Sequence, residues 1–151
     1  MITFIAAFMA YLSPTHNQAR YEAIAADIVH VAEADPIDND PLRTSLLLAA
    51  IAYRESQYRP DVETCKVTGD SGKALGLWQT HSSDKVCRDR REAARVALRM
   101  IHRSLDACQR LNPADRLGMY THGRCVPNNW HSRDRFRLVN NWIDAYLPEE
   151  M

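Results

Sequence analysis

The sequence predicts a mainly α-helical protein, with a helical part built around one buried central helix and a small irregular or β-hairpin part inserted after that helix. Three observations predict this fold class. Apolar residues recur at helical spacing over much of the 151-residue chain. Residues 46–52 are apolar on all sides, which is typical of a helix buried in a core. Pro60 and three glycines then break the helical pattern between residues 59 and 89.

The length and composition predict one domain. A chain of 151 residues with 46% hydrophobic residues can form a single core, so we expect one domain over residues 1–151. Residues 1–14 form an apolar N-terminal segment that is too short to span a bilayer. No basic residue precedes its apolar core, and no clear signal-peptide cleavage site follows. We expect a first helix that packs on the domain; a degenerate export signal is the alternative.

Capping residues predict where the next two helices begin. Thr15 with Gln18 forms a capping-box pattern, so a helix should run from there to about residue 34. Asp40 suits the N-cap and Pro41 the first position of the following helix. That helix should contain the apolar stretch and end at about residue 58.

The rest of the chain should contain one irregular segment and three more helical segments. Residues 62–67 are expected to form a short strand or hairpin. Helical spacing returns at about Arg90 and continues to Cys108. The Asn-Pro pair at residues 112–113 predicts a short helix, and Ser132 can cap a last helix that ends near residue 147.

Charge and motif content restrict the class of partner. The chain has 19 basic and 19 acidic residues and a formal net charge of zero, whereas a dedicated nucleic-acid binder usually has a basic excess. We expect no nucleic-acid partner and no stable membrane span. The zero net charge is compatible with a neutral or zwitterionic substrate. The sequence contains neither an H-E-x-x-H motif nor a C-x-x-C pair, so we expect no zinc and no other cofactor.

The four cysteines predict two disulfides. An even number of cysteines in a small chain is typical of a protein that reaches an oxidising compartment. Three pairings are possible, and we favour bonds between neighbours in sequence, Cys65 with Cys87 and Cys108 with Cys125. We therefore expect an extracytoplasmic protein. Four free thiols in a cytosolic protein are the alternative.

Glu55 is the candidate catalytic acid. It comes at the end of the helix that should contain the buried stretch. Partial burial disfavours a charged carboxylate, and so does the negative end of a helix dipole. Both effects raise the pKa of a carboxyl group, as a general acid that works near neutral pH requires. The alternative is a solvated glutamate that forms an ion pair with Arg54 or Arg59.

Three short motifs follow one another between residues 46 and 123. Residues 55–60 (E-S-Q-Y-R-P) match the pattern E-S-x-(F/Y)-x-P, and residues 76–79 (G-L-W-Q) are close to G-L-M-Q. Residues 119–123 (M-Y-T-H-G) are a looser match to A-Y-N-A-G. In this order they resemble the lysozyme-like superfamily, especially the lytic transglycosylases and goose-type lysozymes, with a phage-type endolysin among the possibilities. The resemblance implies an α+β lysozyme-like fold and cleavage of the β-1,4 MurNAc–GlcNAc linkage of bacterial peptidoglycan.

The resemblance implies a chemical role for three of the matching residues. Glu55 would protonate the glycosidic oxygen as the bond breaks. Ser56 would hydrogen-bond the substrate's acetamido group or hold Glu55; the alternative is an ordinary polar residue at a helix end. Gln79 offers both a donor and an acceptor to a neutral sugar or to the acid.

The other matching residues would shape a substrate-binding site. Gly76, followed by Leu77, would let the backbone approach a sugar without a side chain in the way. Trp78 would stack on a pyranose ring or, as the alternative, pack in the core. Tyr120 would line the site near the acid, unless it is a core tyrosine. Thr121 stands where the family has asparagine, so no side-chain role is carried over to it.

A second carboxylate would decide between two reaction types. A retaining hydrolase needs one about 5 Å from the acid, and an inverting hydrolase one about 6.5–9.5 Å away. Asp70 is the candidate base, ahead of Glu63 and Asp84, although its Gly-Asp-Ser-Gly context is equally typical of a plain turn. Lytic transglycosylases need no second carboxylate, because the substrate's acetamido group assists and the muramoyl 6-hydroxyl closes a 1,6-anhydro ring.

These considerations favour a lytic transglycosylase that acts on peptidoglycan glycan strands as a monomer. It would work in the periplasm, after secretion, or after delivery to the cell wall by a phage. The first alternative is a peptidoglycan hydrolase, a lysozyme or endolysin, with Asp70 as its second carboxylate. The second alternative is a non-catalytic glycan-binding or phage structural module.

Overall fold

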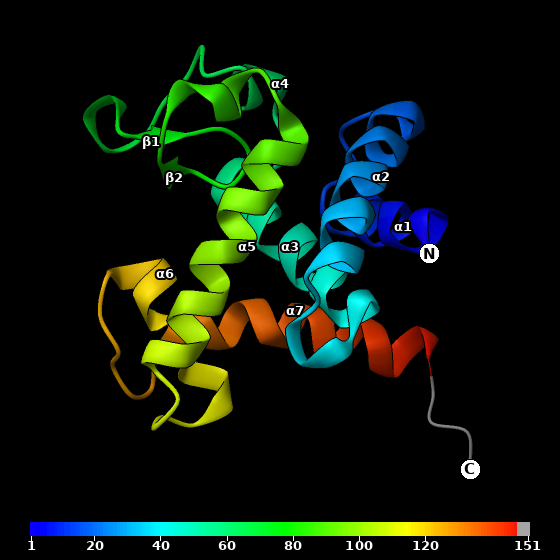
Figure 1. Ribbon diagram of the computed structural model, residues 1–151. Helices are drawn as coiled ribbons and strands as arrows, with labels where there is room; N and C mark the ends of the chain where they lie inside the picture. Colours follow the sequence, from blue (N-terminus) through cyan, green and yellow to red (C-terminus); the bar gives the residue numbers. More distant parts are fainter. Residues whose placement is uncertain (148–151) are drawn as a thin grey trace. The chain divides into compact units, whose positions relative to one another are not determined.

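A computed structural model describes residues 1–147 of the chain (Figure 1). The protein is mainly helical with one small two-stranded antiparallel sheet, as the sequence predicts. The chain divides into two compact units, Met1–Leu98 and the part that begins at Arg99. The boundary falls within helix α5. The single domain expected over residues 1–151 stays a prediction.

The elements follow one another in a simple order. The α-helices are α1 (Ile2–Leu12), α2 (Gln18–Ala34), α3 (Pro41–Ser56), α4 (Pro60–Glu63), α5 (Arg90–Ala107), α6 (Gly118–His122) and α7 (Trp130–Tyr146). The strands are β1 (Ala74–Leu75) and β2 (Thr80–His81). Short 3-10 turns are η1 (Ile37–Asn39), η2 (Asp70–Gly72), η3 (Asp84–Cys87) and η4 (Pro113–Asp115).

The core of the first unit is built from α1, α2 and α3, which pack on one another. Residues 44–52 of α3 are all buried, so the prediction of a buried central helix is confirmed. The N-terminal segment forms α1, whose Ile5, Phe8 and Met9 side chains are fully buried. Each such side chain contributes about 1.5–3 kcal/mol to folding relative to an exposed one. Among residues 1–147, no helix is long and apolar enough to cross a membrane.

Asn and Asp side chains cap the starts of α2, α3 and α7. Asp40 Oδ1 accepts from the Arg43 N–H at 3.0 Å, as predicted for the N-cap of α3. The predicted caps Thr15 and Ser132 are wrong. Asn17 caps α2 and Asn129 caps α7, each through its side-chain oxygen. Ser132 lies inside α7, where its buried hydroxyl donates to the Ala114 carbonyl at 2.6 Å. Asparagine and serine satisfy a free helix N–H about equally well, so composition alone does not select between them.

The strand predicted at residues 62–67 is wrong. Pro60 starts the short helix α4 instead, because its fixed φ suits the first helical position. Val62 belongs to this helix, and its side chain is buried. The hairpin forms later, with Ala74 opposite His81 and Leu75 opposite Thr80. The disulfide Cys65–Cys87 holds this irregular segment, and both cysteines belong to the first unit.

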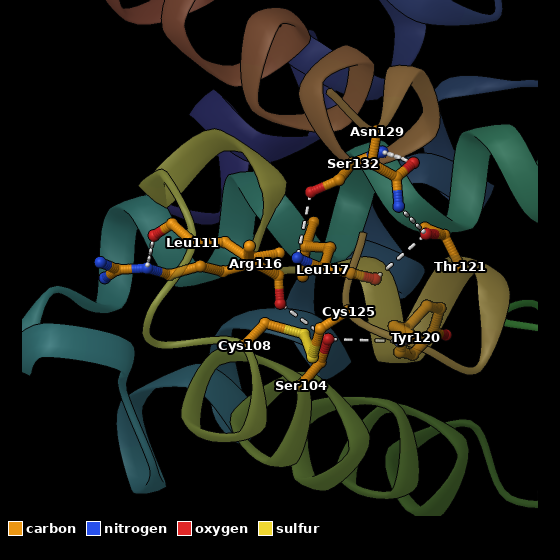
Figure 2. Close-up of a disulfide and its surroundings, with 10 residues drawn as sticks. All are labelled: Ser104, Cys108, Leu111, Arg116, Leu117, Tyr120, Thr121, Cys125, Asn129 and Ser132. Atoms are coloured by element: carbon orange, nitrogen blue, oxygen red, sulfur yellow. Dashed lines mark hydrogen bonds between the residues drawn. A yellow bond between two sulfur atoms is a disulfide. The ribbon is translucent and has the colours of Figure 1, made fainter. Parts of the chain in front are cut away.

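The second unit is fastened by the disulfide Cys108–Cys125 (Figure 2). Both predicted disulfides therefore form, with sequence separations of 22 and 17 residues. In the chain-entropy model each bond contributes about 3 kcal/mol by restricting the unfolded chain. Two disulfides point to a non-reducing, extracytoplasmic environment.

Candidate active site

An open pocket of about 300 Å³ lies in the first unit at the C-terminal end of α3. Its walls come from the end of α3 and the turn after it, from α4, and from the segment between residues 67 and 79. Glu55 and Gln79 both line it. The lining residues are Arg54, Glu55, Ser56, Gln57, Arg59, Val62, Val67, Thr68, Gly69 and Gln79.

Glu55 is placed in this pocket by the way α3 ends. It is half-buried in the last turn of the helix, which stops at Ser56. Gln57 and Tyr58 follow with φ of 51° and 59°, so two consecutive non-glycine residues adopt the left-handed conformation. This costs about 1–2 kcal/mol per residue. The turn reverses the chain directly after the acid, so Arg59 returns to the rim of the same pocket.

Ser56 stabilises this turn through its buried hydroxyl. Its Oγ donates to the Ala52 carbonyl at 2.8 Å and accepts from the Tyr58 N–H at 3.3 Å. The alternative that we gave for Ser56, a polar residue that completes a helix end, accounts for both of these bonds. Contact with a substrate acetamido group stays a prediction, since Ser56 also lines the pocket.

Gln79 reaches the pocket from the turn that joins β1 and β2. Its Nε2 donates to the Gly76 carbonyl at 2.9 Å, within the same turn. Gly76 has φ of 75°, a backbone conformation that favours glycine, so it shapes the turn that carries Gln79. A Cβ at Gly69 would lie 2.6 Å from Gln79 Oε1. Gly69 is therefore a site residue that the sequence analysis missed, because only the folded hairpin brings it against Gln79.

The placement of Leu77 and Trp78 at a substrate site is wrong: both belong to the core, which for Trp78 is the alternative that we gave. Each side chain is 1% exposed. Trp78 Nε1 donates to the Leu48 carbonyl of α3 at 2.9 Å, which satisfies the polar end of the buried indole. A ring enclosed in this way cannot stack on a sugar. Gly76 is buried and is not among the pocket residues either.

Asp70 lies beside the pocket without lining it. Its side chain is 69% exposed, and its Oδ2 lies 2.8 Å from Nε2 of the exposed His81. Glu63 instead forms ion pairs with Arg20 and Arg90, and Asp84 forms an exposed ion pair with Arg88. Among the described residues that line the pocket, Glu55 is thus the one acidic residue.

Tyr120 lies on α6, in the second unit (Figure 2). It is half-buried, and its backbone N–H donates to Ser104 Oγ at 3.3 Å. Ser104 Oγ also donates to the Arg116 carbonyl at 2.7 Å. The hydroxyl of Thr121 donates to the Leu117 carbonyl at 3.1 Å, which gives this residue a structural role in α6. The role of Tyr120 near the acid stays a prediction.

Comparison of the chain with models of protein families, with curated proteins and with solved structures gave no match.

Proposed function

We propose that this protein cleaves the β-1,4 linkage between MurNAc and GlcNAc in bacterial peptidoglycan as a lytic transglycosylase. One observation carries the proposal: a half-buried glutamate at the end of a buried helix is the one acidic residue among the described residues of an open pocket. Gln79, the last residue of the second motif, lines the same pocket. The resemblance of both motifs to the lytic transglycosylases supplies the substrate class.

One carboxyl group suffices for this chemistry. Glu55 donates its proton to the glycosidic oxygen while the bond from that oxygen to C1 of the muramoyl sugar breaks. The substrate's acetamido oxygen stabilises the electron-deficient C1. The Glu55 carboxylate then accepts the proton of the 6-hydroxyl, whose oxygen bonds to C1 and closes the 1,6-anhydro ring. Glu55 ends the cycle protonated, and no water is consumed.

The position of Asp70 supports this reaction over hydrolysis. An inverting hydrolase needs a carboxylate that activates water across the sugar from the acid. Asp70 is mostly exposed, paired with His81 and outside the pocket lining. The two disulfides fit a substrate that lies outside the cytoplasm.

Replacement of the acid tests the proposal. Glu55→Gln keeps the size and hydrogen-bonding capacity of the side chain but removes the transferable proton. We expect its activity on purified peptidoglycan to fall by about 10²–10⁴-fold, as is typical when a general acid is lost. Glu33→Gln, an exposed position on α2, is the matched control and should stay active. Thermal melts of both variants check that they fold. A folded and fully active Glu55→Gln protein would refute the proposal.

A further inference from the structure

The turn after Glu55 has an unusual backbone. Gln57 and Tyr58 both have positive φ, and neither is a glycine. Strain of this kind persists where surrounding groups fix the backbone, and it concentrates at functional sites. The groups that fix these two residues are therefore candidates for positioning the pocket.

Tyr58 is fixed first through its side chain. The ring is fully buried, and its hydroxyl donates to the Ala49 carbonyl of α3 at 2.7 Å. Burial raises the pKa of the Tyr58 phenol well above its usual range, so the hydroxyl keeps its proton and stays a donor. This anchors the ring under the helix that carries Glu55, but it leaves the two turn carbonyls to other partners.

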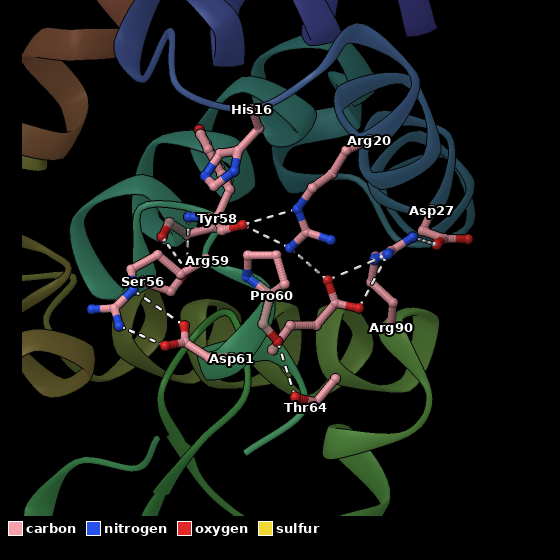
Figure 3. Close-up of polar contacts among 12 residues, drawn as sticks. His16, Arg20, Asp27, Ser56, Tyr58, Arg59, Pro60, Asp61, Thr64 and Arg90 are labelled. Atoms are coloured by element: carbon pink, nitrogen blue, oxygen red, sulfur yellow. Dashed lines mark hydrogen bonds and ion pairs between the residues drawn. The ribbon is translucent and has the colours of Figure 1, made fainter. Parts of the chain in front are cut away.

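Both turn carbonyls are bound by side chains from far upstream in the sequence, and Figure 3 shows Arg20 at the Tyr58 carbonyl. Arg20 Nε and Nη2 both donate to the Tyr58 carbonyl, at 3.0 and 2.6 Å. His16 Nε2 donates to the Gln57 carbonyl at 2.9 Å. A guanidinium can give two parallel N–H groups to one acceptor, which a lysine ammonium does not reproduce.

Arg20 is itself held in place. Its Nη2 lies 2.9 Å from Glu63 Oε1, and Glu63 Oε2 lies 3.0 Å from Nη2 of Arg90. Arg90 Nη1 lies 3.1 Å from Asp27 Oδ2. These four side chains are 17–21% exposed, so solvent screens them less than it screens surface ion pairs. Figure 3 shows how this chain of contacts runs from Asp27 and Arg90 to the Tyr58 carbonyl.

We infer that Arg20 is a positioning residue, which fixes the strained turn and thereby the placement of Glu55 and of Gln57 and Arg59 on the pocket rim. The inference rests on the proposed function. Arg20 is not among the pocket-lining residues, and it acts through the Tyr58 carbonyl. Without it, Tyr58 can relax toward negative φ and move the rim residues on either side. A misplacement of about 1 Å costs on the order of 10²-fold in rate.

Kinetics of three variants test this role. Arg20→Met removes both bonds to the Tyr58 carbonyl, and Arg20→Lys retains the charge facing Glu63. Arg91→Met is the control, because Arg91 pairs with Asp27 of the same ionic cluster through an exposed side chain. On soluble glycan fragments, we expect kcat to fall by about 10²-fold in Arg20→Met and by roughly tenfold in Arg20→Lys. KM should change by less than about twofold, since the loss is in transition-state placement. Arg91→Met should match the wild type.

Hydrogen exchange of the turn amides gives a second readout that does not need activity. Faster exchange at residues 57–59 in Arg20→Lys, with an unchanged melting temperature, supports the positioning role. A folded Arg20→Lys protein with wild-type kcat would overturn the positioning role. A kcat that falls only in proportion to the fraction of unfolded protein would overturn it as well. If Arg20→Met does not fold, Arg20→Lys decides. An inactive wild-type protein whose turn still responds to Arg20 would overturn the proposed function and, with it, the catalytic part of this inference.

Discussion

Glu55 and Asp70 are two carboxyl groups in very different surroundings. Glu55 is half-buried at a helix end and shares its pocket with the aliphatic side chains of Val62 and Val67. Asp70 is in an exposed turn and faces His81. Burial disfavours a charged carboxylate, so of the two positions the half-buried one is better suited to a general acid. An exposed aspartate paired with a histidine is well suited to hold a turn together.

Asp70→Asn should therefore leave most of the turnover intact, because in a transglycosylase the substrate supplies the attacking hydroxyl. The free energy of unfolding should change by less than about 1 kcal/mol, since exposed ion pairs contribute little. Asp84→Asn, which also removes one partner of an exposed ion pair, is the matched control. Steady-state turnover and thermal melts check both variants. A folded Asp70→Asn protein as inactive as Glu55→Gln would make Asp70 the base of a hydrolase.

At the scale of the residue, the sequence was informative where the signal is local. Glu55 and Gln79 belong to short motifs, and both line one pocket. The second of these motifs left Trp78 open between a sugar-stacking ring and a core ring, because that choice depends on the contact with α3. Gly69 was missed for the related reason that its close neighbour Gln79 is brought to it only by the hairpin.

The start of α7 depends on one buried carboxylate. Asp115, on η4, is 2% exposed and accepts from the N–H groups of Asn128 and Asn129 at 3.1 and 2.9 Å. Arg133 adds two bonds, at 2.7 and 3.0 Å. The Arg133 hydrogen bond is the main cause that holds the pKa of Asp115 well below its usual range, and the two backbone N–H groups act in the same direction. Asp115 thus joins η4 to the loop and helix that follow.

Asp115→Asn should lower the melting temperature at neutral pH by several degrees. Because folding lowers the pKa of Asp115, its stabilisation is present above the unfolded pKa of about 3.9 and is lost as the pH falls toward the folded value. The difference in melting temperature between wild type and variant should therefore shrink below about pH 4. Melts from pH 7 to pH 2.5 check this, with the exposed Asp106→Asn as control. A gap that stays constant over this range would contradict the proposed cause.

At the scale of the element, periodicity located the helices and capping patterns located some of their ends. The Asp40-Pro41 pair begins α3 as predicted, because the cap and the proline give the same signal. Thr15 and Asn17 compete for one helix start, and Asn17 makes the cap bond with the Arg20 N–H at 2.8 Å. The hairpin lies later in the chain than predicted, because Pro60 starts the short helix α4 where the strand was expected.

For the whole molecule, the two disulfides are the feature that the sequence located best. Each joins neighbouring cysteines and closes a short loop within one compact unit. The ionic chain through Arg20, Glu63 and Arg90 could not be predicted, because its members come from separate elements and no local pattern joins them. The acid and its pocket belong to the first unit, whereas Tyr120 belongs to the second.

Under the proposed mechanism, Glu55 cleaves peptidoglycan without consuming water. Mass spectrometry of the products released from purified peptidoglycan tests it most directly, with Glu55→Gln digested in parallel. We predict muropeptides that end in 1,6-anhydromuramoyl residues from the wild-type protein, and none from the variant. Reducing muramoyl ends would contradict the transglycosylase reaction and indicate a hydrolase, and the absence of any new glycan ends would contradict cleavage altogether.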